Sequence, residues 1–468
     1  MKKYLLLLAM LFASAGAMMA QDVFDFDEDD DEEDEEVEMT DDEMTDDEMM
    51  VTDLEGNEGI IDFPEAMTYD LDSLMNLFMS KTYLSEDEDC RTTDENPTFD
   101  RDVYIERLMR MPTIMEMPFN DVVQKFIERY SGRLRHSVSY MLGACNFYMP
   151  IFEEALDAYD LPLELKYLPV IESALNPKAV SRVGATGLWQ FMLTTGKQYG
   201  LEVNSLVDER RDPVKASYAA AHYLSDLYKV FGDWNLVIAS YNCGPGNITK
   251  AIRRAGGAKD YWQIYPYLPR ETRGYVPAFI AANYVMNYYS AHNICPLRTK
   301  LPTKTDTVVV TRNVHLAQIA AVLDIDIDML RTLNPEYRRD IVPGLTKPSA
   351  IKLALNDVTR FIDNQDSIYN YNAGELLSKR AEVNVPDDEP TFSSYKKTRK
   401  SRKATARKAT TRKTTKATAG KKTTARKKTA AKPKASTKAK AKTKASTKAS
   451  TKTKAKPKAK AKTTRRRR

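Results

Sequence analysis

Residues 168–191 read LPVIESALNPKAVSRVGATGLWQF, and this stretch decides the fold prediction. One acidic residue, Glu172, lies inside an apolar run with helical spacing. If the segment ELKYLPVIESAL is helical, Glu172 shares a face with three leucines, because the four are separated by three, four and three residues. The leucines are Leu165, Leu168 and Leu175. The Glu172 carboxyl group is therefore predicted to point into apolar surroundings.

A carboxyl group in such surroundings favours its neutral form, so its pKa is expected to rise from about 4.3 towards neutrality. A neutral carboxyl group can donate a proton at neutral pH. The alternative, from position alone, is a buried glutamate whose hydrogen bonds to backbone or tyrosine are purely structural. The residues that follow Glu172 favour a catalytic role over a structural one. Ser173 can hydrogen-bond a carboxylate, and Asn176 before Pro177 is expected to end the helix.

The next residues suit a sugar-binding groove. Gly184 and Gly187 allow tight turns, and Trp189 and Gln190 supply a flat aromatic face and an amide group. Sugar rings have apolar faces and hydroxyl or acetamido edges, so a saccharide site needs this mixture.

Helical spacing of apolar residues continues from about Arg101 to His292, which predicts a mainly helical domain. Asp212 before Pro213 is a favourable helix start. Further on, a Gly-Pro-Gly break separates two helical segments in 231–257. This break is expected to leave the side chains of the preceding Tyr and Asn at a helix end, where they can face a groove.

Three motifs resemble those of the lytic transglycosylases of glycoside hydrolase family 23, which have a lysozyme-like fold. The first covers residues 172–191, the second is SYNCGPGN at 240–247, and the third is LPRETRGYVPAFIAA at 268–282. Their order and spacing are similar to the membrane-bound murein transglycosylase D type of that family. The resemblance covers roughly residues 100–295.

This resemblance implies that Glu172 is the single catalytic acid and base. It would protonate the glycosidic oxygen between N-acetylmuramic acid and N-acetylglucosamine, then take the proton from the muramoyl 6-hydroxyl as that group closes onto the anomeric carbon. An internal attack of this kind can manage with one carboxylate. The sequence fits, since no other Asp or Glu follows Glu172 until Glu202.

The resemblance also implies a set of substrate-binding residues. They are Ser173, Gln190, Tyr241, Asn242, Glu271 and Tyr275. Ser173 would orient neighbouring groups, and Tyr241 would support the sugar or the catalytic acid. Gln190 and Asn242 would contact acetamido or hydroxyl groups.

Two of these assignments have structural alternatives. Glu271 could equally pair with Arg270 or Arg273, and Tyr275 could equally be a core residue. No metal or cofactor is expected, because the four histidines have no metal-ligand spacing and no phosphate-binding loop is present.

Residues 306–355 read as a strand, two short helices and a strand, which predicts a separate small module. The module resembles LysM, a domain that binds glycans containing N-acetylglucosamine. The usual Gly-Asp-Thr-Leu is replaced by Arg-Asn-Val-His at 312–315, so the shape is expected to persist and glycan binding to be weakened or lost. The predicted fold is thus mainly α: a lysozyme-like domain at 99–298, an α+β LysM-like module at 303–358, and a linker at 359–395.

The ends of the chain differ sharply in composition. Residues 1–20 have the lysines, apolar core and small residues of a secretory signal peptide, although a retained anchor is the alternative. Residues 22–55 hold 21 acidic and no basic residues, whereas 396–468 hold 33 basic and no acidic residues. Such blocks repel themselves and bury little, so 21–98 and 396–468 are predicted to be largely disordered.

Export predicts a periplasmic or extracytoplasmic protein, peripheral at most to the outer membrane or cell wall. Four cysteines then permit disulfides, although their pairing cannot be read from the sequence. The expected partner is the peptidoglycan glycan strand. The basic tail is suited to anionic polymers or lipopolysaccharide without specific nucleic-acid recognition, or to a role as a solvated tether. The alternatives to an enzyme are a non-catalytic wall-binding scaffold and a polyanion-binding protein.

Overall fold

The computed structural model describes residues 48–52, 56, 58–68, 84, 85, 90, 95–299 and 301–377. The predictions for the signal peptide, for most of the acidic segment and for the basic tail lie outside the described residues. Within the described part of the chain, no helix has the length and apolar character needed to cross a bilayer.

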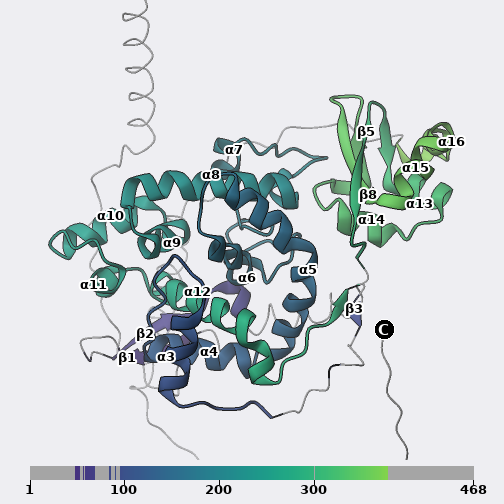
Figure 1. The fold of residues 1–468 in the computed structure, drawn as a ribbon. Coiled ribbons are helices and arrows are strands. Elements are labelled where there is room, and N and C mark those ends of the chain that lie inside the picture. Colours follow the sequence, from purple (N-terminus) through teal and green to yellow (C-terminus); the bar gives the residue numbers. More distant parts are fainter. Residues whose placement is uncertain are drawn as a thin grey trace, which may run out of the picture. The chain divides into compact units, whose positions relative to one another are not determined.

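Residues 101–288 form a helical domain (Figure 1), as predicted. Its helices are α3 (Arg101–Arg110), α4 (Asp121–Ser131), α5 (Arg135–Asp157), α6 (Leu168–Ser173), α7 (Leu193–Gln198), α8 (Pro213–Phe231), α9 (Trp234–Cys243), α10 (Pro245–Arg254), α11 (Tyr261–Ile264) and α12 (Arg270–Tyr288). Short 3-10 turns connect them: η3 (Leu163–Tyr167), η4 (Glu209–Arg211), η5 (Tyr265–Tyr267) and η6 (Tyr289–His292).

Local sequence signals set the ends of several helices. The Asp212 side chain accepts hydrogen bonds from the N–H groups of Val214 and Lys215, and Pro213 occupies the first turn of α8. Helix α9 ends before Gly244, which has a φ of 84°, and α10 starts at Pro245. Both boundaries were expected from the sequence.

A short acidic segment packs on the helical domain. Strands β1 (Glu48–Thr52) and β2 (Glu58–Asp62) form an antiparallel hairpin, and η2 (Glu65–Met67) follows. Its apolar side chains enter the core: Val51, Ile61, Phe63 and Met67 are buried. These residues differ from the prediction of a largely disordered segment, because a few apolar side chains among the acids bury enough surface to hold the chain.

The same end of the chain is tied down by a disulfide. Cys90 bonds Cys295, with 5.9 Å between their Cα atoms, while Cys145 and Cys243 are free. Close by, β3 (Leu84–Ser85) pairs antiparallel with β4 (Arg298–Thr299). The N-terminal segment is therefore linked to the chain just beyond α12.

The second module contains the predicted strand, two helices and strand. These are β5 (Thr305–Val310), α13 (Leu316–Leu323), α14 (Ile327–Leu333) and β8 (Ser349–Ala354), with β5 and β8 antiparallel. A second antiparallel pair, β6 (Asn313–His315) and β7 (Ile341–Pro343), was not predicted. His315 caps α13 by accepting a hydrogen bond from Ala317 N at 3.1 Å.

The module extends further than its predicted boundary at residue 358. Helices α15 (Leu355–Asp363), α16 (Gln365–Asn370) and α17 (Ala373–Leu376) follow β8. Phe361 and Ile368 are fully buried in the module's core, and Gln318 Nε2 donates to Ile368 O at 3.0 Å. A linker was expected from residue 359 because the segment is polar overall. Its few apolar residues lie on one narrow face of the helices, and this face packs on the module core.

Candidate active site

Glu172 lies near the end of α6, and Figure 1 shows this helix among the other helices of the domain. Pro169 occupies the first turn of this helix, where its missing N–H is not needed, so it introduces no kink. The helix ends at Ser173 and not at Asn176 as predicted. Ala174 and Leu175 adopt left-handed conformations with φ of 47° and 62°, and Leu175 N bonds back to Pro169 O at 3.2 Å. The three leucines predicted to share the face of Glu172 are all fully buried.

The Glu172 side chain is half-buried and receives a hydrogen bond from the Tyr275 hydroxyl to Oε1. Burial raises the pKa of Glu172 to about 8; the Tyr275 hydrogen bond opposes this, and the nearby carboxylates of Glu271 and Glu65 add to it. The folded-state pKa is thus above the ordinary value, so the carboxyl group is mostly protonated at pH 7. It can act as a proton donor there.

Helix α12 supplies two residues to this site. Tyr275 is almost fully buried, and its hydroxyl bonds Glu172, so it is both a core residue and a partner of the acid. Glu271 lies one turn earlier and accepts a hydrogen bond from Asn242 Nδ2 at 3.5 Å. Partial desolvation raises the pKa of Glu271, and the Asn242 hydrogen bond opposes this rise.

The arginines that flank Glu271 have other partners. Arg270 Nη2 lies 2.7 Å from a Glu48 carboxylate oxygen and 3.1 Å from one of Asp62. Arg273 donates to the backbone oxygens of Leu268 and Pro266. Among the described residues, Glu271 bonds Asn242 and neither arginine, so this arrangement differs from the pairing considered from the sequence.

The end of α9 brings two more predicted residues to the site. Tyr241 is close enough to Glu172 that, after burial, the Glu172 charge is the largest cause of its raised pKa. The Tyr241 hydroxyl donates to Trp189 O at 2.7 Å. Asn242 Oδ1 accepts from Thr272 Oγ1 at 2.7 Å, which orients its amide group towards Glu271.

Two residues of the first motif point into the core, which differs from the sugar contact expected of Trp189. Ser173 is fully buried, and its hydroxyl bonds Pro169 O at 3.0 Å and Leu188 O at 2.9 Å. Trp189 is also fully buried, with its indole N–H donating to Ser217 Oγ at 2.9 Å. Both side chains are committed to the core, so they support the site from behind.

We call residues 184–191 the signature loop. Gln190 lies in it and is half-buried, and its amide donates to Gly187 O at 2.7 Å. Gly187 has a φ of 90°, and a Cβ atom there would lie 1.9 Å from Arg210 O. Only glycine fits that position, because the loop backbone runs against the backbone of Arg210.

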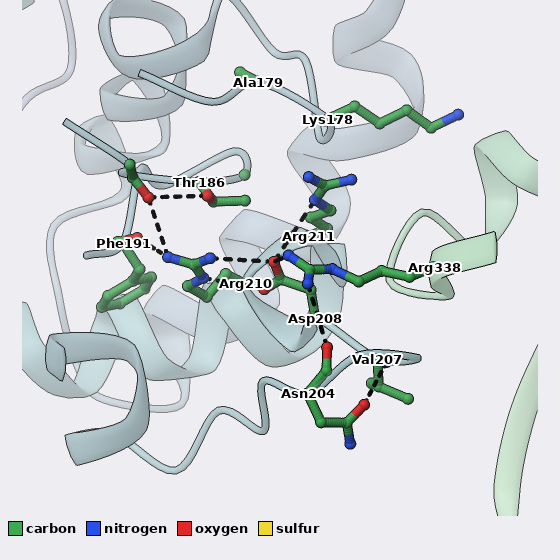
Figure 2. Close-up of polar contacts among 12 residues, drawn as sticks. Lys178, Ala179, Thr186, Phe191, Asn204, Val207, Asp208, Arg210, Arg211 and Arg338 are labelled. Carbon is green, nitrogen blue, oxygen red and sulfur yellow. Dashed lines mark hydrogen bonds and ion pairs between the residues drawn. The ribbon is translucent and has the colours of Figure 1, made fainter. Parts of the chain in front are cut away.

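A buried ion-pair cluster beneath the loop was not predicted (Figure 2). Asp208 is fully buried and accepts from Arg210 Nε at 3.0 Å and Nη2 at 3.1 Å. Arg210 Nη1 donates to Gly184 O at 3.2 Å and Phe191 O at 3.1 Å. The sequence DERRD at 208–212 carried a signal, since it places three acidic residues beside two arginines.

Glu65 is a second residue that sequence reasoning missed. Its Oε1 accepts a hydrogen bond from Arg182 N at 3.3 Å, and its charge contributes to the raised pKa of Glu172. It follows a strongly acidic stretch, so nothing distinguished it from its neighbours. In the described part of the chain, no group of three His, Cys, Asp or Glu side chains could hold a metal ion.

The helical domain that holds Glu172 and the second module both match known families. Residues 149–264 match the family model of the transglycosylase SLT domain, and residues 304–370 match that of the LysM-like domain of lytic transglycosylase MltD. The chain thus carries an SLT domain followed by an MltD-type LysM-like domain, which confirms the resemblance inferred from the three motifs.

Individual relatives agree with these matches. The chain is 32% identical over 229 residues to membrane-bound lytic murein transglycosylase D of Escherichia coli K12, covering 47% of this chain and 49% of that protein. It is 33% identical over 124 residues to the soluble lytic murein transglycosylase of the same strain, covering 25% and 19%. The chain therefore spans about half the length of the first of these relatives.

A solved structure is also similar. It is the 70 kDa soluble lytic transglycosylase SLT70 from Escherichia coli, with 29% identity and a TM-score of 0.27, covering 31% of this chain and 25% of that one.

Proposed function

We propose that this protein is a peptidoglycan lytic transglycosylase that cleaves the β-1,4 bond between N-acetylmuramic acid and N-acetylglucosamine. The observation that carries the proposal is the Glu172 carboxyl group, half-buried in an SLT domain, bonded by Tyr275 and with its pKa raised to about 8. A general acid is most effective when its pKa lies near the working pH.

In the proposed reaction, Glu172 donates its proton to the glycosidic oxygen as the bond to the anomeric carbon breaks. The N-acetylglucosamine side leaves with that proton. The Glu172 carboxylate then takes the proton of the muramoyl 6-hydroxyl, whose oxygen bonds the anomeric carbon. The product is a 1,6-anhydromuramoyl end, Glu172 is protonated again, and no water is consumed.

The environment of Glu172 suits both halves of this cycle. Burial favours the neutral acid in the first half, and the Tyr275 hydrogen bond stabilises the carboxylate in the second. The neighbouring carboxylates of Glu271 and Glu65 raise the pKa of Glu172 and are assigned no proton transfer of their own. Gln190, Tyr241 and Asn242 are proposed to bind or orient the sugar.

Digestion of purified sacculi tests the proposal. We expect the wild-type protein to release anhydromuropeptides detectable by mass spectrometry, and Glu172→Gln to reduce the rate at least about 1,000-fold. Glu271→Gln is the matched control, because it neutralises the adjacent carboxyl group and is expected to lower the rate only about tenfold. Equal release by Glu172→Gln and wild type would contradict the proposal and favour a wall-binding scaffold.

The cellular setting is proposed on the same basis. The name of the Escherichia coli relative describes it as membrane-bound, which supports association with the outer membrane or wall in the periplasm. Binding of glycan by the LysM-like domain, and of anionic polymers or lipopolysaccharide by residues 396–468, stays a prediction. Retention on heparin at rising salt, with and without residues 396–468, tests the tail.

A further inference from the structure

The LysM-like module contributes a charged group to a buried cluster in the SLT domain (Figure 2). Arg338 lies in η7 (Arg338–Asp340) of the module, and its Nη2 lies 3.0 Å from Asp208 Oδ2. Arg338 Nη1 also donates to Asn204 O at 3.3 Å. A carboxylate as deeply buried as that of Asp208 is tolerated only when its oxygens are paired, so the module supplies part of that pairing.

Backbone contacts surround this ion pair. Asp208 N donates to Glu336 O at 2.9 Å, and Arg338 N donates to Leu206 O at 2.7 Å. A small apolar cluster lies beside them and comprises Leu206, Val207 and Ile341. These backbone hydrogen bonds and buried apolar side chains fix the position of the module segment against residues 206–208. The side chain of Arg338 is thereby held close to Asp208.

The same carboxylate holds the signature loop through a second arginine. Arg210 uses Nε and Nη2 for Asp208 and Nη1 for the carbonyls of Gly184 and Phe191. One guanidinium thereby binds both ends of the loop. Its position depends on Asp208, which in turn is shared with Arg338.

The loop is bonded to the immediate neighbours of the catalytic acid. Leu188 O accepts from the hydroxyl of Ser173, the residue after Glu172. Trp189 O accepts from the hydroxyl of Tyr241. Both carbonyls lie between the two that Arg210 holds, so a shift of the loop would displace groups on two sides of the acid.

We propose that Arg338 is a positioning residue for the catalytic domain: by pairing with Asp208, the LysM-like module holds the signature loop and hence the surroundings of Glu172. The module then supports catalysis mechanically, whether or not it also binds glycan. The kinetic consequence rests on the proposed function, whereas the structural coupling does not.

Hydrogen–deuterium exchange measures the coupling without any substrate. Peptides covering 179–191 contain Gly187, whose N–H bonds Ala179 O at 2.9 Å. We expect Arg338→Ala to speed exchange there severalfold and Arg338→Lys to give an intermediate rate, with peptides of α8 unchanged. Arg360→Ala is the matched control, since Arg360 pairs with Asp357 inside the module at 2.5 Å and is expected to leave 179–191 unchanged.

Kinetics on short soluble glycan strands give a second readout. Arg338→Ala is expected to lower kcat/KM about tenfold, because the loop that Arg338 holds flanks Glu172 and carries the proposed sugar-binding residue Gln190. Unchanged exchange at 179–191 in a folded Arg338→Ala protein would overturn the proposal. If that variant does not fold, Arg338→Lys decides by the same criterion. A wild-type protein that fails to cleave sacculi would refute the proposed function but leave the exchange test valid.

Discussion

The proposed chemistry depends on one proton of the Glu172 carboxyl group. Glu172 is placed by a helix of only six residues and is held by Tyr275, which comes from a helix about a hundred residues further on. Burial pushes the carboxyl group towards its neutral form, and the tyrosine pulls it back. The balance leaves a pKa of about 8, at which both protonation states are accessible during the proposed reaction.

Removal of the Tyr275 hydroxyl should shift this balance in a known direction. Tyr275 donates to the carboxylate, so Tyr275→Phe destabilises the charged form and raises the pKa of Glu172 further. The first step needs the protonated acid, and activity is lost as pH rises through that pKa. We expect the alkaline limb of the pH profile of kcat/KM to move up by about one pH unit.

Tyr288→Phe is the matched control for this experiment. Tyr288 lies on the same helix and donates to Arg107 O at 2.9 Å. Its removal should cost some stability and leave the pH profile in place. An alkaline limb that moves down in Tyr275→Phe would contradict the assigned role of the hydrogen bond.

The sequence predicted the surroundings of some residues better than those of others, for a physical reason. The position of Glu172 among buried leucines could be predicted because its spacing from them is helical, and helical spacing is a local property. Trp189 was assigned to sugar contact because its flat face suits a sugar ring, and Ser173 was assigned to orienting its neighbours. Which way they face depends on packing against Phe152 and bonding to Leu188, two contacts that no local pattern contains.

At the scale of elements, the signature loop joins the acid to the rest of the domain. The Arg210 guanidinium donates to the Gly184 carbonyl of this loop, and Gly187 N in the loop donates to the Ala179 carbonyl. Its turns require glycine at two points with φ near 90°, Gly184 and Gly187. The two glycines differ only in what surrounds them, which allows a controlled comparison.

We expect Gly187→Ala to be much more destabilising than Gly184→Ala. Both substitutions incur a left-handed backbone cost of roughly 1 kcal/mol. Only at Gly187 would the new Cβ meet Arg210 O at 1.9 Å, whereas nothing lies within 4 Å at Gly184. The added cost should be roughly 2 kcal/mol or more in denaturant unfolding. Equal losses in the two variants would show that the loop relaxes away from Arg210.

Element boundaries were the least predictable feature. Helix α6 ends at Ser173 because the chain turns back through two left-handed residues, and neither Ala174 nor Leu175 favours that conformation intrinsically. The helices after β8 were predicted as linker, since their apolar residues are few. Phe361 and Ile368 become visible as core residues only once β5 and β8 form the surface that they cover.

At the scale of the whole described structure, long-range links hold segments that are far apart in the sequence. The disulfide joins Cys90 to Cys295 across a separation of 205 residues, and Arg338 joins the module to Asp208. The sequence allowed disulfides but left their pairing open, because proximity of distant cysteines is a consequence of the fold. The contact between Arg338 and Asp208 could likewise not be predicted from the sequence, because it joins two domains.

The disulfide should contribute measurably to stability. Closing a long loop restricts the unfolded chain, and its loss is expected to cost roughly 2–5 kcal/mol. Reductant should therefore lower the Tm of wild type, and the Cys90→Ala/Cys295→Ala variant should show the lower Tm with or without reductant. Cys145→Ser is the control and should keep the reductant effect. A wild-type Tm insensitive to reductant would argue against this pairing.

The protonation state of Glu172 can be measured directly. With glutamate labelled at the carboxyl carbon, NMR titration of wild type and Glu172→Gln identifies the Glu172 resonance by difference. We expect a midpoint near pH 8 for that resonance. A midpoint near the ordinary value of about 4.3 would mean that the carboxyl group is charged at neutral pH and is not the ready proton donor described above.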